Sequence, residues 1–219
     1  MLGIIFTGGQ GPSPQIARRL IETEAKEPLF IAADSGLDAA ESTGVKPDWI
    51  IGDMDSIEDP SRLAAFPQER VIRHKKDKDY TDTELAFMFA VEKGADNIWI
   101  IGGGGGRIDH LFGIRSLFER EIFPRRWITE SADIHCIDAD LATADKLCRR
   151  VEKGSTVSVF PLGDGNWEAK SSALKWQLEG VKWERGLFGL SNVAVDGDFS
   201  ITAQAGRFMV ILPLSDILR

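Results

Sequence analysis

Short apolar segments alternate with helix signals along the first 130 or so residues, and this alternation constrains the fold more than any other feature of the sequence. Helix signals include Ser13-Pro14, the capping-box pattern Thr81-Asp82-Thr83-Glu84, and Lys93-Gly94 at a helix end. Strands that alternate with helices pair in parallel, so the pattern predicts an α/β domain with a doubly wound, mostly parallel sheet. The expected strands are residues 2–6, 29–33, 49–51, 71–72 and 97–101, and the expected helices are 14–24, 36–40, 82–93 and 109–121.

The pattern changes after about residue 132. Turn sequences such as Gly163-Asp164-Gly165-Asn166 and Asp196-Gly197-Asp198 separate short apolar segments there. Short strands at such spacing predict an antiparallel, sandwich-like β domain. These strands are expected at 134–137, 156–160, 173–178, 188–190 and 208–212. We therefore expect an α/β domain over residues 1–132 and an all-β domain over residues 133–219.

Charge and cysteine content narrow the classes of partner. The 219 residues carry a formal net charge of −8, which opposes the phosphate backbone of DNA or RNA. Cys136 and Cys148 are the only cysteines and lack the spacing of a zinc site, so we expect reduced thiols and a cytoplasmic protein. No apolar run approaches the roughly 18 residues of a membrane span. The sequence favours a small anionic ligand over nucleic acid or membrane.

Acidic residues follow the predicted strands one after another. Because the carboxyl ends of parallel strands meet at one edge of the sheet, we expect these carboxylates to converge. Asp53 and Asp55 are two residues apart, so in an extended conformation their side chains point to the same side and share a cation. Magnesium takes carboxylate and phosphate oxygens as ligands. The residues of this predicted edge are Asp34, Asp53, Asp55, Asp79 and Asp82.

Residues for a phosphate group lie nearby. Residues 102–106 are all glycine, and backbone amides without a neighbouring Cβ can approach phosphate closely. The segment is not a Walker loop, because Arg107-Ile108 follow its last glycine. Arg107 offers a planar fork of donors, and Asp109-His110 open a helix whose N-terminus favours anions. The lysines of the run Lys75-Lys76-Asp77-Lys78-Asp79 add positive charge.

Structural explanations compete with these assignments. Asp82 suits the first turn of a helix through the helix dipole alone, and His110 suits a partly buried helix position. The lysine run is also typical of a solvated charged segment, and Asp53 with Asp55 of a solvated acidic turn.

Several segments together resemble the thiamin pyrophosphokinase family. They are Ala33-Asp34-Ser35-Gly36, Gly52-Asp53-Met54-Asp55-Ser56-Ile57, Lys78-Asp79-Tyr80-Thr81-Asp82 and Gly105-Gly106-Arg107-Ile108-Asp109-His110, in the family's order. Gly189-Leu190-Ser191-Asn192 is similar to the family's Ser-Asn segment. The resemblance implies transfer of the pyrophosphoryl group of ATP to the hydroxyl of thiamin, with Mg²⁺ as cofactor. It also implies a homodimer with the thiamin site at the subunit interface.

The resemblance implies a role for each matching residue. Asp53, Asp55 and Asp79 are expected to bind the metal, and Asp82 to lie near the thiamin hydroxyl. The expected catalytic set is Asp55, Asp79, Asp82 and Arg107. Expected ATP-binding residues are Asp34, Gly105, Gly106, Arg107, Asp109 and His110, and expected thiamin-binding residues are Asp82, Ser191 and Asn192.

One departure from the family concerns the acceptor pocket. Val193-Ala194-Val195 follow the Ser-Asn pair where the family has an acidic or aromatic residue, so Trp176 or Trp183 is expected to supply the aromatic contact. Three alternative functions stay open on the residues alone. They are a pyrophosphokinase for another heterocyclic alcohol such as a hydroxymethylpterin, a magnesium-dependent phosphohydrolase, and a non-catalytic nucleotide-binding regulator.

Overall fold

The structure is a computed structural model that describes residues 1–142 and 145–217. The chain divides into two compact units, Met1–Glu130 and Ser131–Arg219. Within the described residues, no helix has the length and apolar character needed to cross a membrane.

Unit 1 is built on a parallel sheet whose strand order reverses beside its first strand. The chain runs outward from β1 to β4 and then continues on the other side of β1 with β5 and β6. Neighbouring strands are parallel throughout, in the order β6 (Arg126–Ile128), β5 (Asn97–Ile101), β1 (Leu2–Thr7), β2 (Leu29–Ala33), β3 (Trp49–Gly52) and β4 (Val71–Arg73). The expectation of a doubly wound parallel sheet is confirmed.

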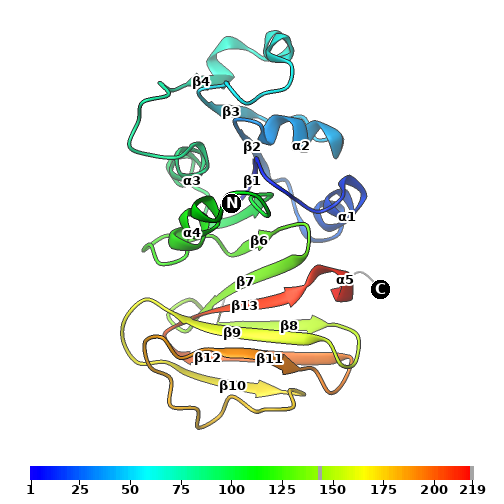
Figure 1. Cartoon of the computed structure of the whole chain (residues 1–219), viewed down its shortest axis with the longest axis vertical. Coiled ribbons are helices and arrows are strands. Elements are labelled where there is room, and N and C mark those ends of the chain that lie inside the picture. The colour runs from blue at the N-terminus through cyan, green and yellow to red at the C-terminus, as the bar shows by residue number, and fades with distance from the viewer. Residues whose placement is uncertain (143–144, 218–219) are drawn as a thin grey trace. The chain divides into compact units, whose positions relative to one another are not determined.

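Four helices cover this sheet. Figure 1 shows α1 (Pro14–Glu24) and α2 (Gly36–Ser42) on one face and α3 (Asp82–Glu92) and α4 (Ile108–Leu117) on the other. Two short 3-10 helices, Pro60–Ala65 and Gln68–Arg70, connect β3 to β4.

Capping residues predicted from the sequence start helices α1 and α3, whereas α4 ends earlier than predicted. Ser13 caps α1 by accepting a hydrogen bond from the Ile16 amide at 3.4 Å. The expected capping box of α3 is present, with Thr81 and Glu84 each accepting from the other's backbone amide at 3.2 and 3.1 Å. α4 ends at Leu117, four residues before its expected end. The following turn buries Phe118 fully, so packing overrides the local helix signal.

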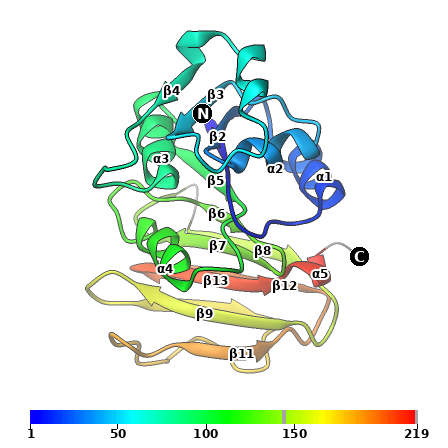
Figure 2. The same ribbon diagram turned by 45° about the horizontal axis from the view of Figure 1, so that its top comes forward.

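Unit 2 is a sandwich of two antiparallel sheets. Figure 2 shows the larger sheet, in the order β11 (Gly189–Val193), β9 (Thr156–Leu162), β13 (Arg207–Pro213) and β7 (Ala132–Asp138). The smaller sheet is β10 (Glu168–Ser172), β12 (Asp198–Ala205) and β8 (Lys146–Arg150). Val159 and Phe208 of the larger sheet and Phe199 and Ile201 of the smaller one share one buried core. α5 (Leu214–Ile217) follows β13. The predicted β class of this region is confirmed.

One predicted strand of unit 2 is wrong, and three strands were missed. Residues 173–178 form a loop instead of a strand, because Ala173 takes a left-handed φ of 58° that ends the extended chain. β8, β10 and β12 were not predicted as strands. Apart from Cys148, their exposed positions carry Lys, Arg, Asp, Glu, Ser and Gln, so the apolar signal is confined to alternate residues.

Candidate functional site

A polar cleft of about 720 Å³ opens in unit 1 at the carboxyl ends of the strands. The loops that follow β1, β2, β3, β4 and β5 line it. β1 and β5 are neighbours at the point where the strand order reverses, which is where open α/β sheets bind ligands. Of the residues predicted for this unit, all but Asp109 line the cleft, namely Asp34, Asp53, Asp55, Asp79, Asp82, Gly105, Gly106, Arg107 and His110.

Two glycine-rich loops form part of the cleft wall by interlocking. The Gly103 amide donates to the Gly8 carbonyl at 2.8 Å, and Gln10 and Gly104 exchange two backbone hydrogen bonds at 2.6 and 2.9 Å. A Cβ at Gly104 would lie 2.6 Å from the Gln10 carbonyl oxygen, so glycine is required for this approach.

The five consecutive glycines therefore divide into two groups. The amides of Gly102, Gly103 and Gly104 donate to backbone carbonyls within the unit. Gly105 and Gly106 both have a left-handed φ of 62°, and their amides form no hydrogen bond among the described residues. Only these last two amides are free to bind an anion.

Three carboxylates meet at the floor of the cleft. Asp34 follows β2, Asp53 follows β3, and Asp82 begins α3, with one oxygen of each lying within 4.8 Å of the others. Asp34 is 9% exposed and has a left-handed φ of 48°. Its Oδ1 atom is buried and has no hydrogen-bond partner among the described residues. We call Asp34, Asp53 and Asp82 the acidic cluster.

Asp55 and Asp79 line the cleft but lie outside the acidic cluster. The extended conformation that would align Asp55 with Asp53 ends at Gly52, and Met54 takes a left-handed φ of 66° while its side chain packs into the core. The Asp53 side chain is therefore 13% exposed and that of Asp55 is 41% exposed. The extended backbone on which the expected sharing of one cation by Asp53 and Asp55 was based is absent from the structure.

Two lysines of the predicted basic run also reach the cleft. Lys76 donates a hydrogen bond to Asp55 at 2.5 Å. This hydrogen bond and, to a smaller extent, one from Ser56 lower the pKa of the Asp55 carboxyl. Lys78 Nζ lies 3.3 Å from Asp53 Oδ2 and 3.0 Å from Asp82 Oδ1. The lysine run is therefore not merely a solvated charged segment.

Burial and charge have opposite effects on the pKa values of Asp82 and Lys78. Burial raises the pKa of the Asp82 carboxyl, and the Lys78 ammonium offsets only part of that effect. Burial alone would lower the pKa of Lys78, but its hydrogen bonds and charge interactions with Asp82 and Asp53 raise it above the ordinary value. Lys78 is therefore fully charged at neutral pH.

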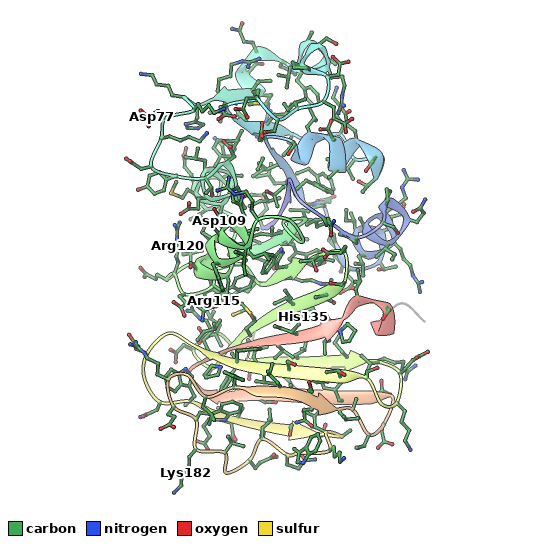
Figure 3. All side chains as sticks on the ribbon, viewed as in Figure 1. Asp77, Asp109, Arg115, Arg120, His135 and Lys182 are labelled. Carbon is green, nitrogen blue, oxygen red and sulfur yellow. The ribbon has the colours of Figure 1, made fainter. Side chains whose placement is uncertain are left out.

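At the start of α4 the guanidinium of Arg107 and the carboxylate of Asp109 form a two-pronged pair. This pair lowers the pKa of the Asp109 carboxyl. Figure 3 shows Asp109 at the beginning of that helix and Asp77 in the loop before α3. The Asp109 carboxylate thus occupies the donor fork that the sequence assigned to phosphate.

The C-terminal residues predicted for the acceptor lie on β11. Ser191 is exposed, with a left-handed φ of 57°. Asn192 is 6% exposed, and its side chain accepts from the Trp176 amide at 3.1 Å and donates to the Trp176 carbonyl at 2.6 Å. Trp176 is 55% exposed, whereas Trp183 packs its edge against Phe208 in the core, with ring centroids 5.3 Å apart. Of the two predicted tryptophans, Trp176 is the accessible one.

Sequence reasoning missed several polar groups of the cleft. Thr7 at the end of β1 and Thr83 in the first turn of α3 join their hydroxyls at 2.6 Å, and both line the cleft. The position of Thr7 directly after an apolar strand could have identified it. Tyr80, the only tyrosine of the chain, also lines the cleft and is 48% exposed, and no sequence signal identified it as a site residue.

These features define a class of protein, an α/β domain with an acidic and glycine-lined ligand cleft at its topological switch point. Residues 21–125 match the family described as thiamin pyrophosphokinase, catalytic domain. The thiamine pyrophosphokinase of Bacillus subtilis (strain 168) is 39% identical over 88 residues, which is 39% of this chain and 40% of that protein. Residues 21–125 of the chain are thus similar to the catalytic domain of the thiamin pyrophosphokinase family.

Solved structures of similar fold cover both units. The thiamine pyrophosphokinase of Bacillus subtilis has a TM-score of 0.75, with 24% identity over 97% of this chain and 98% of its own. The thiamin pyrophosphokinase of Geobacillus thermodenitrificans has a TM-score of 0.72, with 24% identity over 97% of each chain. At this identity the likeness concerns the fold.

Proposed function

We propose that this protein transfers the pyrophosphoryl group of ATP to the hydroxyl of thiamin, forming thiamin diphosphate and AMP. The observation that carries the proposal is the cleft at the switch point, where the acidic cluster, two lysines and two free glycine amides converge within the segment that matches the family. Carboxylates together with phosphate-binding donors suit a polyphosphate that is bound with a metal ion.

The acidic cluster fits a magnesium ion. Its three carboxylates offer hard oxygen ligands within 4.8 Å of one another, and the buried Oδ1 of Asp34 lacks a partner. We propose that Asp34, Asp53 and Asp82 hold the ion, and that Asp55 and Asp79 reach it or its water shell from the rim. When bound, the metal neutralises charge on the phosphate oxygens.

The protein's own donors would orient ATP. The free amides of Gly105 and Gly106, the Arg107 guanidinium and the Lys78 ammonium suit phosphate oxygens because they combine fixed dipoles with positive charge. Asp109 would release the Arg107 fork when phosphate binds. His110 also lines the cleft and is proposed to contact the nucleotide.

The reaction itself is a single displacement at the β-phosphorus. The thiamin oxygen forms a bond to that phosphorus, and the bond from the β-phosphorus to the oxygen of the α-phosphate breaks. The hydroxyl proton is released, and AMP leaves with the bridging oxygen. We propose that Asp82, at the start of α3 in the acidic cluster, lies beside this hydroxyl.

Unit 2 would supply the acceptor site. Ser191 offers a hydroxyl, and the exposed ring of Trp176 offers an aromatic face to the cationic thiazolium. Asn192 would act by holding the Trp176 backbone. We further propose a homodimer with the thiamin site at the subunit interface, supported by exposed apolar side chains on and beside the edge strand β11, namely Trp176, Phe188, Leu190 and Val195.

An acceptor panel tests the proposed reaction against its alternatives. AMP formation from ATP and Mg²⁺ is measured with thiamin, with a hydroxymethylpterin and without an organic acceptor. We expect AMP only with thiamin. AMP formation with the pterin alone would indicate a pyrophosphokinase for another acceptor. Phosphate release without an acceptor would indicate a phosphohydrolase. ATP binding without turnover would indicate a regulator.

Substitutions on β11 should separate a direct acceptor contact from a structural one. Ser191→Ala is expected to raise KM for thiamin about three- to tenfold, the value of one neutral hydrogen bond, without changing KM for ATP. Asn192→Ala should raise KM for thiamin and also lower the free energy of unfolding by about 1–3 kcal/mol, because the partly buried hydrogen bonds of Asn192 with the Trp176 backbone are lost. Kinetics and urea unfolding measure both effects. Unchanged thiamin kinetics in both variants, or equal loss for ATP, would place the acceptor elsewhere.

A further inference from the structure

Lys78 lies among carboxylates that the proposed function assigns to a metal ion. Its Nζ atom is 3.3 Å from Asp53 Oδ2 and 3.0 Å from Asp82 Oδ1. The Lys78 side chain is only 15% exposed, compared with 82% for Lys76, which pairs with Asp55 near the rim. Lys78 is therefore the lysine that contacts the acidic cluster itself.

The charges of the cluster are only partly neutralised by this contact. One ammonium faces Asp53 and Asp82, while Asp34 Oδ1 is buried and has no partner among the described residues. Carboxylates held within 4.8 Å of one another repel in a partly buried site. Three carboxylates face a single ammonium, which leaves two negative charges, and a divalent ion that replaces the ammonium leaves only one.

We propose that Lys78 is the resident counter-ion of the acidic cluster, which a divalent metal displaces when it binds. The ammonium and the metal compete for the same oxygens of Asp53 and Asp82. Once displaced, the flexible lysine side chain can turn its charge toward phosphate oxygens in the same cleft. Lys78 thus stabilises the acidic cluster before metal binds and then becomes a positioning residue for the polyphosphate. This inference rests on the proposed function, because it takes the cluster to be the metal site.

Binding of manganous ion alone, measured by electron paramagnetic resonance on the full chain without nucleotide, tests the competition. Lys78→Met should bind Mn²⁺ at least about fivefold more tightly than the wild type, since the loss of one positive charge at this distance matters even at the dielectric constant of water. Lys75→Met, an exposed neighbour outside the cleft lining, removes the same charge and should keep wild-type affinity. Affinity in Lys78→Met that is equal to or below the wild-type value would overturn the inference.

Thermal unfolding gives a second readout if Lys78→Met folds poorly. Without metal this variant should unfold at a lower temperature than the wild type, and Mn²⁺ should raise its Tm by more than it raises the wild-type Tm. Lys78→Arg keeps the charge and should resemble the wild type in both measurements. A Tm deficit that Mn²⁺ does not reduce would make Lys78 a structural residue only.

The same measurements distinguish this inference from the proposed function. Competition between Lys78 and Mn²⁺ in a protein that forms no thiamin diphosphate would refute the function and leave the inference intact. Thiamin diphosphate formation with unchanged Mn²⁺ affinity in Lys78→Met would support the proposed function and refute the inference.

Discussion

Gly36→Ala is expected to destabilise unit 1 by more than about 4 kcal/mol, which exceeds the effect of most point substitutions. Gly36 is the first residue of α2 and packs directly on β1. A Cβ there would lie 2.1 Å from the Phe6 carbonyl oxygen and 2.5 Å from its carbon. Both atoms belong to the backbone of Phe6, which is fully buried, so no side-chain rotation relieves the clash. Urea unfolding followed by circular dichroism measures the loss.

Gly113→Ala is the matched control. Gly113 lies inside α4, and a Cβ there would have no heavy atom within 4 Å. Alanine in a helix interior stabilises the helix by about 0.5–1 kcal/mol relative to glycine. This variant should therefore be slightly more stable than the wild type. Equal stability of the two alanine variants would show that α2 does not pack on β1 as closely as described.

Asp53→Asn is expected to lower turnover by about 10²–10³, the usual cost of removing one electrostatic contact at a reacting phosphate or carbonyl. Asp53 belongs to the acidic cluster and contacts Lys78, and its side chain is 13% exposed. The amide keeps the shape of the carboxylate but gives up a charged metal ligand. Because the change also removes one of three mutually repelling charges, we expect the fold to be retained.

Steady-state kinetics with saturating Mg²⁺ and a parallel unfolding curve separate these two effects. Asp77→Asn serves as the control, since Asp77 lies in the loop before α3 but does not line the cleft (Figure 3). It should have wild-type turnover. Activity within a few-fold of wild type in Asp53→Asn would remove this residue from the metal site.

The α/β fold could be predicted from sequence because its signals are local. Strands 29–33 and 97–101 have the predicted bounds, and Ser13 and Thr81 start their helices as expected. Unit 2 was less predictable, since its smaller sheet alternates single apolar residues with charged ones. The left-handed φ of Ala173, a residue that rarely adopts this conformation, could not be predicted from sequence.

The candidate site, like the fold, could be predicted from sequence only in part. Because ligands bind at the carboxyl ends of parallel strands, Asp34, Asp53 and Asp82 were predicted to lie at one edge of the sheet. In the structure one oxygen of each lies within 4.8 Å of the others. The separation of Asp55 from Asp53 depends on the left-handed backbone of Met54, which follows from burial of that side chain and has no local signature. The division of the glycine run depends on contacts with Gly8 and Gln10, about a hundred residues away in the chain. Non-local contacts of this kind are outside what spacing alone can predict.

The central claim, pyrophosphoryl transfer to thiamin, is tested most directly by following the β-phosphorus of ATP. The wild-type protein is incubated with Mg²⁺, thiamin and ATP that carries ³²P at the β position, and the products are separated by chromatography. We predict that the label appears in thiamin diphosphate and that unlabelled AMP forms in equal amount. Label in ADP or in inorganic pyrophosphate, with no labelled thiamin diphosphate, would contradict the proposed reaction.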